Sequence, residues 1–378
     1  MIKMKRRILF ILLIALVGLM LLSIFAVAQS AKARTINVDD NGGANYTKIQ
    51  DAINAASPGD TVYVYNGIYN EQITINKAIN LTGENSDGTI IKGDGSEYSI
   101  GIKITRNSTI RCFWIDRFGS CIAILGGSET TVSDNKITNG TDSGISVGYT
   151  KTGGFFGSNF VNTSTNSNTI LRNTITNTID SVHIYKSQYN VVSNNIFMNN
   201  TSRSDYERGH AVLLESCSYN EVSLNVVRNI NCSVHLKSGS NNRIIGNSIE
   251  NGHDGIHLEG CTYNLISENT IMNQQGLLRG YGIYLTNSDN NTVTSNNITN
   301  SHMNGIYLEY SSNNLVAYNN IKNCGREGIC MYGCRYGNTI RDNTIKQDEQ
   351  RVPGFEFAWL YVSTITVTIL FSKRKRVK

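Results

Sequence analysis

The segment Asn264-Leu-Ile266-Ser-Glu-Asn269-Thr-Ile271-Met-Asn273, followed by Gly282-Ile283-Tyr-Leu285, decides the fold of this chain. In both segments apolar residues alternate with polar ones, which is the period-two pattern of a β-strand with one buried face. Strands this short are not stable alone. They persist only where copies of the same unit stack on one another, so the pattern predicts a solenoid.

The same unit recurs through the body of the chain. Seven close copies begin at Asn168, Asn190, Asn220, Asn242, Asn264, Asn291 and Asn314, and looser copies begin at Ser108, Thr130 and Asn338. The base period is 22 residues, as from Asn168 to Asn190, and longer steps indicate insertions. Because parallel crossovers are right-handed, ten stacked copies predict an all-β fold, a single-stranded right-handed parallel β-helix.

An asparagine five residues after each repeat start is the most regular polar feature. It recurs in nine copies, at Asn135, Asn173, Asn195, Asn225, Asn247, Asn269, Asn296, Asn319 and Asn343. Asparagine tolerates left-handed turns, and stacked amides can hydrogen-bond from coil to coil as a ladder. We therefore assign this row to architecture rather than to a polar binding surface.

Ahead of the repeats, residues 46–56 have helical apolar spacing at Ile49, Ala52, Ile53 and Ala56, and Pro58 follows. This predicts a helix that caps the solenoid. The expected organisation is a signal peptide at 1–33, an N-terminal cap with the first coils at 34–100, β-helix repeats at 101–347, and a C-terminal sorting or transmembrane tail at 348–378.

The N-terminus indicates export. Basic residues precede an apolar run over residues 8–28, and Ala31-Lys32-Ala33 has the small-x-small pattern of a signal-peptidase site. We predict cleavage after Ala33. The run is long for a signal core, so an uncleaved membrane anchor is the alternative.

The C-terminus has three parts: Pro353-Gly354-Phe355, a nearly uncharged stretch to Phe371, and a basic end. This tail resembles the archaeal PGF-CTERM sorting signal. The resemblance implies that an archaeosortase removes the tail and leaves a lipid-anchored surface protein. The alternative is an ordinary transmembrane helix, and both place residues 34–352 outside the membrane.

The formal charge of +5 does not describe the body of the protein. Removing the +5 carried by residues 1–33 and the +4 carried by residues 353–378 leaves −4 for the mature body. A nucleic-acid partner is therefore not expected. Eight cysteines in an exported chain permit disulfides. The best candidates are Cys324, Cys330 and Cys334, and the others are expected to be buried as small apolar residues.

The segment from Ile49 to Gly83, together with the Gly-Ile-x-Leu and Asn-x-Ile repeats, resembles the pectin-lyase-like β-helices. The likeness is greatest to the NosD-like, CASH-type group found on archaeal surfaces. This resemblance implies the fold over residues 35–347. It implies no single activity, because the superfamily includes lyases, epimerases, hydrolases, copper-handling proteins and adhesins.

The residue between Ile and Leu of each Gly-Ile-x-Leu strand should point outward, which predicts an exposed row along the solenoid, called the stripe here. The expected stripe is Ala123, Val161, His183, Leu213, His235, His257, Tyr284, Tyr307 and Met331, with the register lost at Val161 through an insertion, and a second row is Tyr185, Glu215, Lys237, Glu259, Thr286 and Glu309. Rings beside carboxylates suit a sugar polymer. The expected ligand-binding residues are His183, Tyr185, His235, His257, Tyr284, Tyr307 and Glu309. The alternative is that these residues merely pair well across a solvated sheet.

Insertions should gather at a binding face. Three interrupt the repeats: residues 148–167 with Tyr149, Phe155, Phe156 and Phe160; residues 201–209 with Asp205 and Arg208; and residues 274–280 with Arg279. They are expected to surround His183, His210, His235, His253, Asp254 and His257.

Catalysis has weaker support from the sequence. Glu215 and Glu259 are two coils apart, at the limit for a glycosidase pair, and Asp254 with His257 or His235 is an acid–base alternative. The chain has no Asp-Pro-His-Asp motif of mannuronan epimerases and no acidic calcium cluster of pectate lyases.

Metal binding is a further alternative, with copper at His235 and His257 or with calcium, and a structural surface-layer or adhesin role is another. We predict an extracellular, surface-anchored protein that binds polysaccharide along the stripe, with lyase, epimerase or hydrolase activity left open.

Overall fold

The computed structural model describes residues 32–152, 159–163, 165–200, 209–275 and 279–347. The predicted sorting tail and almost all of the predicted signal peptide lie outside these residues. Within the described residues, no helix is long and apolar enough to cross a membrane.

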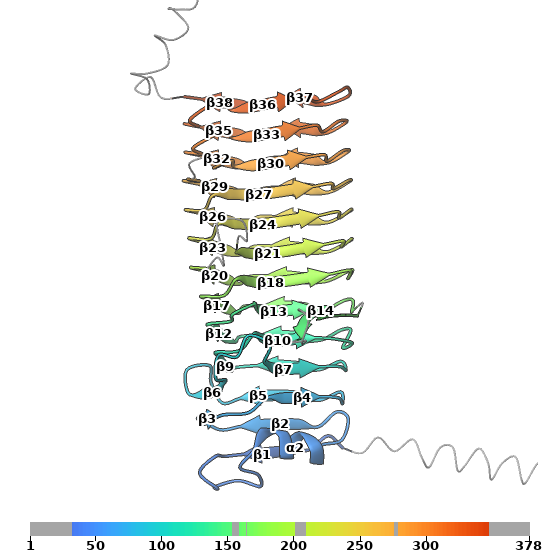
Figure 1. Cartoon of the computed structure of the whole chain (residues 1–378), viewed down its shortest axis with the longest axis vertical. Helices are drawn as coiled ribbons and strands as arrows, with labels where there is room; N and C mark the ends of the chain where they lie inside the picture. Colours follow the sequence, from blue (N-terminus) through green and yellow to red (C-terminus); the bar gives the residue numbers. More distant parts are fainter. Residues whose placement is uncertain (1–31, 153–158, 164, 201–208, 276–278, 348–378) are drawn as a thin grey trace, which may run out of the picture.

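The chain winds into three long parallel sheets that run the length of the molecule (Figure 1). The 13-stranded sheet runs from β1 (Thr35–Val38) to β37 (Thr339–Arg341), the 11-stranded sheet from β4 (Ile73–Ile75) to β36 (Ile329–Tyr332), and the 12-stranded sheet from β3 (Gly67–Tyr69) to β38 (Thr344–Lys346). One coil contributes one strand to each sheet, as in β27 (Asp254–Glu259), β28 (Leu265–Ser267) and β29 (Thr270–Met272). The predicted right-handed parallel β-helix is therefore confirmed.

Within the three long sheets, every strand pairs with its counterpart one coil away. For example, β24 (Cys232–Lys237) lies between β21 (His210–Glu215) and β27 in parallel register. The inward residues consequently form continuous columns. The column two residues after each repeat start is fully buried, at Ile110, Val132, Ile170, Val192, Val222, Ile244, Ile266, Val293 and Val316. In the last coil the equivalent Ile340 is 38% exposed, so the described part of the solenoid is open at this end.

The asparagine row forms the expected ladder inside the solenoid. In each coil, the backbone N–H and the side-chain Nδ2 donate to the Oδ1 of the asparagine one coil further on, as from Asn225 to Asn247 at 3.0 Å for both bonds. The repeat-start asparagines form a second ladder of the same kind, as from Asn220 to Asn242. Both rows are buried except in the last described coil, where Asn338 and Asn343 are half-buried, so the architectural interpretation holds.

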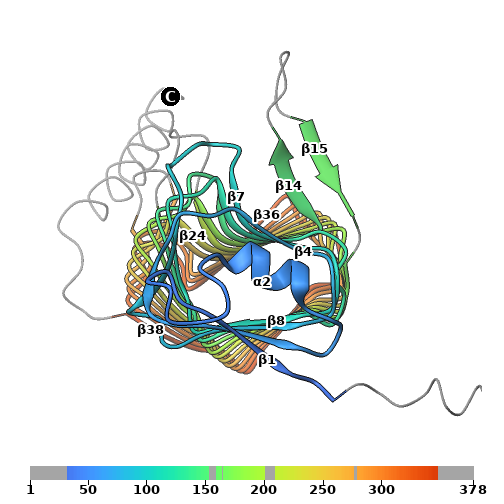
Figure 2. The same ribbon diagram turned by 90° about the horizontal axis from the view of Figure 1, so that it is seen from below.

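Helix α2 (Ile49–Ala55) lies across the N-terminal opening of the solenoid, as Figure 2 shows. Its buried face consists of Ile49, Ala52 and Ile53. The carboxylate of Glu71 accepts hydrogen bonds from the backbone N–H groups of Ile49 and Gln50, at 2.9 and 3.0 Å. These two bonds satisfy donors that the first helical turn leaves free, and the predicted cap is confirmed.

The assignment of two residues, Val161 and Met331, to the stripe is wrong. Ser146, not Val161, pairs with Ala123 and His183, because strand β13 (Ser143–Val147) completes its coil before the insertion begins. Val161 instead belongs to an antiparallel hairpin of β14 (Tyr149–Thr152) and β15 (Asn159–Asn162) that branches off the solenoid.

At the C-terminal end, Cys330 rather than Met331 pairs with Tyr307, since the following turn is one residue longer than in the preceding coil. All eight cysteines are free, so Cys324, Cys330 and Cys334 form no disulfide in this structure.

Candidate functional site

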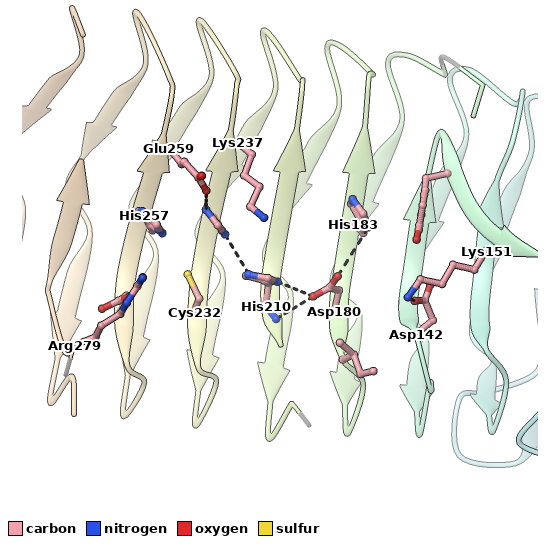
Figure 3. Close-up of a pocket in the computed structure, with 14 residues that line it drawn as sticks. Asp142, Lys151, Asp180, His183, His210, Cys232, Lys237, His257, Glu259 and Arg279 are labelled. Carbon is pink, nitrogen blue, oxygen red and sulfur yellow. Dashed lines mark hydrogen bonds and ion pairs between the residues drawn. The ribbon is translucent and has the colours of Figure 1, made fainter. Parts of the chain in front are cut away.

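The outward face of the 11-stranded sheet carries a pocket of about 390 Å³ (Figure 3). It is lined by Asp142, Tyr149, Lys151, Ile179, Asp180, His183, His210, Cys232, His235, Lys237, Asp254, His257, Glu259 and Arg279. Hairpin strand β14 supplies Tyr149 and Lys151, and the third insertion supplies Arg279. Two of the three predicted insertions thus contribute described residues to one site.

Salt bridges tie these two walls to the sheet. Lys151 Nζ lies 2.7 Å from Asp142 Oδ1, and Arg279 Nη1 lies 3.5 Å from Asp254 Oδ2. The Asp254 side chain is buried, and its Oδ1 also accepts hydrogen bonds from the backbone N–H groups of Gly280 and Tyr281, both at 3.2 Å. Asp254, expected as an acid or base, therefore anchors the Arg279 wall.

The floor combines two rows of side chains. In β18 (Asp180–Tyr185), β21, β24 and β27, the first residue of each strand lies in register with the next, and we call Asp180, His210, Cys232 and Asp254 the first-position row. The fourth residue of each strand belongs to the stripe. Both the second and the third residues are buried, such as Ser233 and Val234. This pair of inward residues breaks the alternation, which turns the first position outward.

A chain of polar contacts joins the two rows. The Asp180 carboxylate accepts a hydrogen bond from Nδ1 of His210 at 2.8 Å, and Nε2 of His210 lies 3.2 Å from Nδ1 of His235. Burial alone would raise the pKa of Asp180, but the His210 and His183 imidazoles outweigh it and lower that pKa. Asp180 is therefore an ionised acceptor that fixes the His210 ring.

The stripe is aromatic as predicted, but its rings are covered. His235 stacks on His257 with centroids 4.4 Å apart, His257 on Tyr284 at 4.6 Å, and Tyr284 on Tyr307 at 5.4 Å. His183, His235, His257 and Tyr284 are only 6–9% exposed. The ring faces contact one another, so a ligand meets ring edges rather than open stacking platforms. This corrects the expectation of an exposed stripe.

Burial also sets the charge of the stripe. The pKa values of His235 and His257 are lowered well below the usual value, first by desolvation and then by the neighbouring His210 and His235 rings respectively. Both imidazoles are therefore neutral near pH 7. Neutral imidazoles in a partly enclosed site can accept a proton or bind a metal ion.

The second outward row keeps its predicted register, from Tyr185 through Glu215, Lys237, Glu259 and Thr286 to Glu309. Glu215 Oε2 lies 3.4 Å from His183 Nε2, and Glu259 Oε2 lies 3.5 Å from His235 Nε2. The contact with His183 lowers the pKa of Glu215. Beyond the pocket, the Tyr284 hydroxyl donates to Glu309.

Sequence reasoning found part of the site. Among the expected ligand-binding residues, His183, His235 and His257 line the pocket, whereas Tyr185, Tyr284, Tyr307 and Glu309 are not among its lining residues. Of the expected catalytic candidates, Asp254, His257 and Glu259 line it and Glu215 does not. His253 lines a separate depression with Asn231 and Gln275. Phe155, Phe156, Asp205 and Arg208 lie outside the described residues, as does the side chain of Phe160.

The residues that were missed are Asp142, Lys151, Ile179, Asp180 and Cys232, whereas Lys237 belongs to the second outward row that the sequence predicted. Small residues at the second strand position, such as Ser181 and Ser233, were the available indication that alternation fails there and that the preceding residue faces outward.

Comparisons with known proteins agree with this architecture. A family model described as "Right handed beta helix region" matches residues 210–352, and one described as "Periplasmic copper-binding protein (NosD)" matches residues 53–206. No curated protein sequence matches the chain.

Solved structures give the same picture. The Dettilon tailspike protein has a TM-score of 0.59 at 14% identity, with 79% of this chain and 64% of the tailspike covered, so the chain spans less than two thirds of that protein. A DFA-IIIase of Arthrobacter chlorophenolicus A6 without its lid has a TM-score of 0.55 at 13% identity, with 83% of this chain and 98% of the DFA-IIIase covered. A mannuronic acid-specific polysaccharide family 6 lyase from human gut microbiota has a TM-score of 0.50 at 12% identity, with 85% of this chain and 89% of the lyase covered. At these identities the likeness shows the fold alone.

The copper-binding description calls for soft or imidazole ligands. One group of three side chains in the described part of the chain meets this requirement: His210, Cys232 and His235 offer ligand atoms that all lie within 4.8 Å of one another. The expected pair of His235 and His257 is stacked face to face instead, with an interplanar angle of 11°. The chain is a right-handed parallel β-helix, and its residues 53–206 are similar to the NosD family.

Proposed function

We propose that this protein binds a polysaccharide in the pocket on the 11-stranded sheet. The observation that carries the proposal is the lining itself. Carboxylates, lysine and arginine side chains and imidazoles converge on one hollow between the β14 wall and the Arg279 wall. A surface with closely mixed donors and acceptors suits a ligand rich in hydroxyl groups, each of which both donates and accepts hydrogen bonds.

The dimensions favour an oligosaccharide segment over a single sugar. Lining residues come from positions beside or within β13, β18, β21, β24 and β27, which are five successive coils. At about 4.8 Å per coil, the pocket runs about 19 Å along the solenoid. A site elongated in this direction fits a polymer that lies parallel to the axis.

Solved neighbours with the same fold add support. One is named as a polysaccharide lyase and another, XylC, was solved with xylose, at a TM-score of 0.53 and 10% identity. These names describe those proteins. They make the long outward face of this solenoid a reasonable place to seek a glycan.

Binding accounts for the site better than catalysis does. A general acid for glycoside cleavage needs a carboxyl group with a raised pKa. Here the pKa values of Asp180 and Glu215 are lowered, and Asp142 and Asp254 hold the pocket walls through Lys151 and Arg279. Lyase, epimerase or hydrolase action is the alternative, and it predicts new reducing ends or unsaturated sugars.

The proposed location is the outer surface of the cell. The signal-like N-terminus, the basic-ended apolar C-terminus and the similarity to a family described as periplasmic support export. Anchoring would proceed through the C-terminal tail, either as a transmembrane helix or after processing by an archaeosortase. There the pocket would face external glycans.

The test is a glycan array on the full-length protein, followed by calorimetry on any hit. Lys237→Gln and Glu259→Gln remove pocket charges, and each should weaken binding about tenfold or more, the usual loss for a charged hydrogen bond. Lys322→Gln on β35 (Asn320–Lys322), which belongs to another sheet, is the matched control and should bind as the wild type does. Tyr307→Ala tests whether the stripe beyond the pocket takes part.

Two outcomes would overturn the proposal. One is the absence of any glycan ligand. The other is a glycan whose affinity is the same for the wild type and for both pocket variants. Appearance of unsaturated products would instead show that the same pocket is catalytic.

A further inference from the structure

The middle of the pocket floor contains three side chains of the kinds that bind metals. His210, Cys232 and His235 come from two adjacent strands, β21 and β24, and each offers one ligand atom that lies within 4.8 Å of the other two. Nε2 of His210 and Nδ1 of His235 are 3.2 Å apart. In a tetrahedral site with metal–nitrogen bonds of about 2.0–2.1 Å, two nitrogen ligands are about 3.3 Å apart. The pair therefore already has the spacing of two tetrahedral ligands.

Each histidine also has a carboxylate at its other nitrogen. Asp180 Oδ1 lies 2.8 Å from Nδ1 of His210, and Glu259 Oε2 lies 3.5 Å from Nε2 of His235. Carboxylates at the outer nitrogens are the usual means by which proteins orient metal-binding imidazoles. The inner nitrogens, His210 Nε2 and His235 Nδ1, face each other across the site.

One additional positive charge between His210 and His235 satisfies every polar atom of this chain of groups, whether it is a second proton on His210 or a bound metal cation. When His210 is neutral and donates its Nδ1 proton to Asp180, its bare Nε2 accepts from Nδ1–H of His235. His235 Nε2 is then without a proton, is buried and makes no hydrogen bond, with the Glu259 carboxylate nearby. A cation between the two rings removes this conflict. Both inner nitrogens then bind the cation, and the proton of His235 moves to Nε2, where it can be donated to Glu259.

We propose that His210, Cys232 and His235 bind one thiophilic metal ion, Cu(I) or Zn(II), with Asp180 and Glu259 as positioning residues. Thiolate with imidazole is a ligand set that both ions accept. The three ligand residues line the pocket, so a ligand in the pocket can reach the ion. The three ligand residues lie outside residues 53–206, which match the copper-binding family.

The test loads the reduced full-length protein separately with Zn(II) and with Cu(I), removes weakly held metal, and measures metal content by mass spectrometry. The wild type should retain about one ion per chain. His210→Ala and Cys232→Ser should each lose most of it, whereas His302→Ala and Cys112→Ser, at a histidine and a cysteine distant from the site in sequence, should retain it. The circular dichroism spectra and melting temperatures of all variants show whether the fold is intact.

Two further measurements separate ligation from a structural effect. Co(II) in place of the native ion should give a sulfur-to-metal charge-transfer band that Cys232→Ser abolishes. Asp180→Asn should lower affinity by about 10–100-fold while keeping the band, as expected for a positioning residue. Failure of the wild type to retain either ion, or equal retention by folded His210→Ala and Cys232→Ser, would overturn the proposal. Neither result bears on glycan binding, which is measured separately with metal-free protein.

Discussion

The asparagine ladder gives the sharpest stability prediction, at Asn247 in the middle of the solenoid. Its Oδ1 accepts bonds from the backbone N–H and from Nδ2 of Asn225, both at 3.0 Å, and its Nδ2 donates to Val222 O and to Asn269 Oδ1. Asn225 and Asn247 are both buried, so Asn247→Ala leaves both Asn225 donors without this acceptor and out of reach of water. At about 1–3 kcal/mol for each unsatisfied buried group, the two donors predict a loss of about 2–6 kcal/mol.

Two further variants give the prediction a graded scale. Asn343, in the last described coil, also accepts two bonds from Asn319, but it is only half-buried, so water can replace part of what Asn343→Ala removes and the loss should be smaller. Asn297 is exposed and accepts one bond from Asn320, so Asn297→Ala should cost under about 0.5 kcal/mol.

The assay is urea denaturation of the full-length protein followed by circular dichroism. Hydrogen exchange of the Asn225 amide provides a local measurement, because a solenoid need not unfold as one unit. The expected order of destabilisation is Asn247, then Asn343, then Asn297. If Asn247→Ala were no more costly than Asn297→Ala, or if the Asn225 amide stayed equally protected, the ladder would not be a source of stability.

Three other predictions concern the cap and the coil packing. Arg34 and the Ser57 backbone N–H lower the pKa of Asp60 to about 2, below its unfolded value of about 3.9. The ionised carboxylate therefore stabilises the fold fully above about pH 4, and this stabilisation is lost as the pH falls toward 2. The melting temperature of Asp60→Asn should converge on that of the wild type over that range, and a constant gap between the two would contradict the assignment. Arg34 N also lies 3.0 Å from Asp60 Oδ1, so a chain that begins at Arg34, with a charged α-amino group there, should melt higher than one that begins several residues earlier, and Asp60→Asn should abolish the difference. A Cβ at Gly282 would lie 2.5 Å from Gly305 O and from Ile298 Cγ2, closer than packed atoms allow. Gly282→Ala should therefore lower the free energy of unfolding by about 1–3 kcal/mol in urea denaturation. An unchanged urea midpoint would show that the coils can separate to accommodate the methyl group.

The sequence by itself determined the solenoid. Apolar period two, the 22-residue step from Asn168 to Asn190 and the recurring asparagines all act between equivalent positions in neighbouring coils. Interactions of this kind depend on the repeat alone, so the inward columns and the ladder of asparagines five residues after each repeat start follow from it. The α2 cap follows from the helical apolar spacing ahead of the repeats. The sequence also predicted which outward residues pair between neighbouring coils wherever the coil length is regular. That prediction failed at Val161 and at Met331, where the length of the coil changes.

Only the tertiary structure decided how the predicted histidines and the missed residues combine into one site. Adjacent inward residues such as Ser233 and Val234 turn Cys232 outward against the alternation expected of a strand. The hairpin after β13 brings Lys151 to Asp142, and stacking of coils places His210 beside His235 although 25 residues separate them. The same stacking covers the faces of the aromatic rings. These features depend on local strand distortions and on the paths of insertions, which hydrophobic periodicity does not encode.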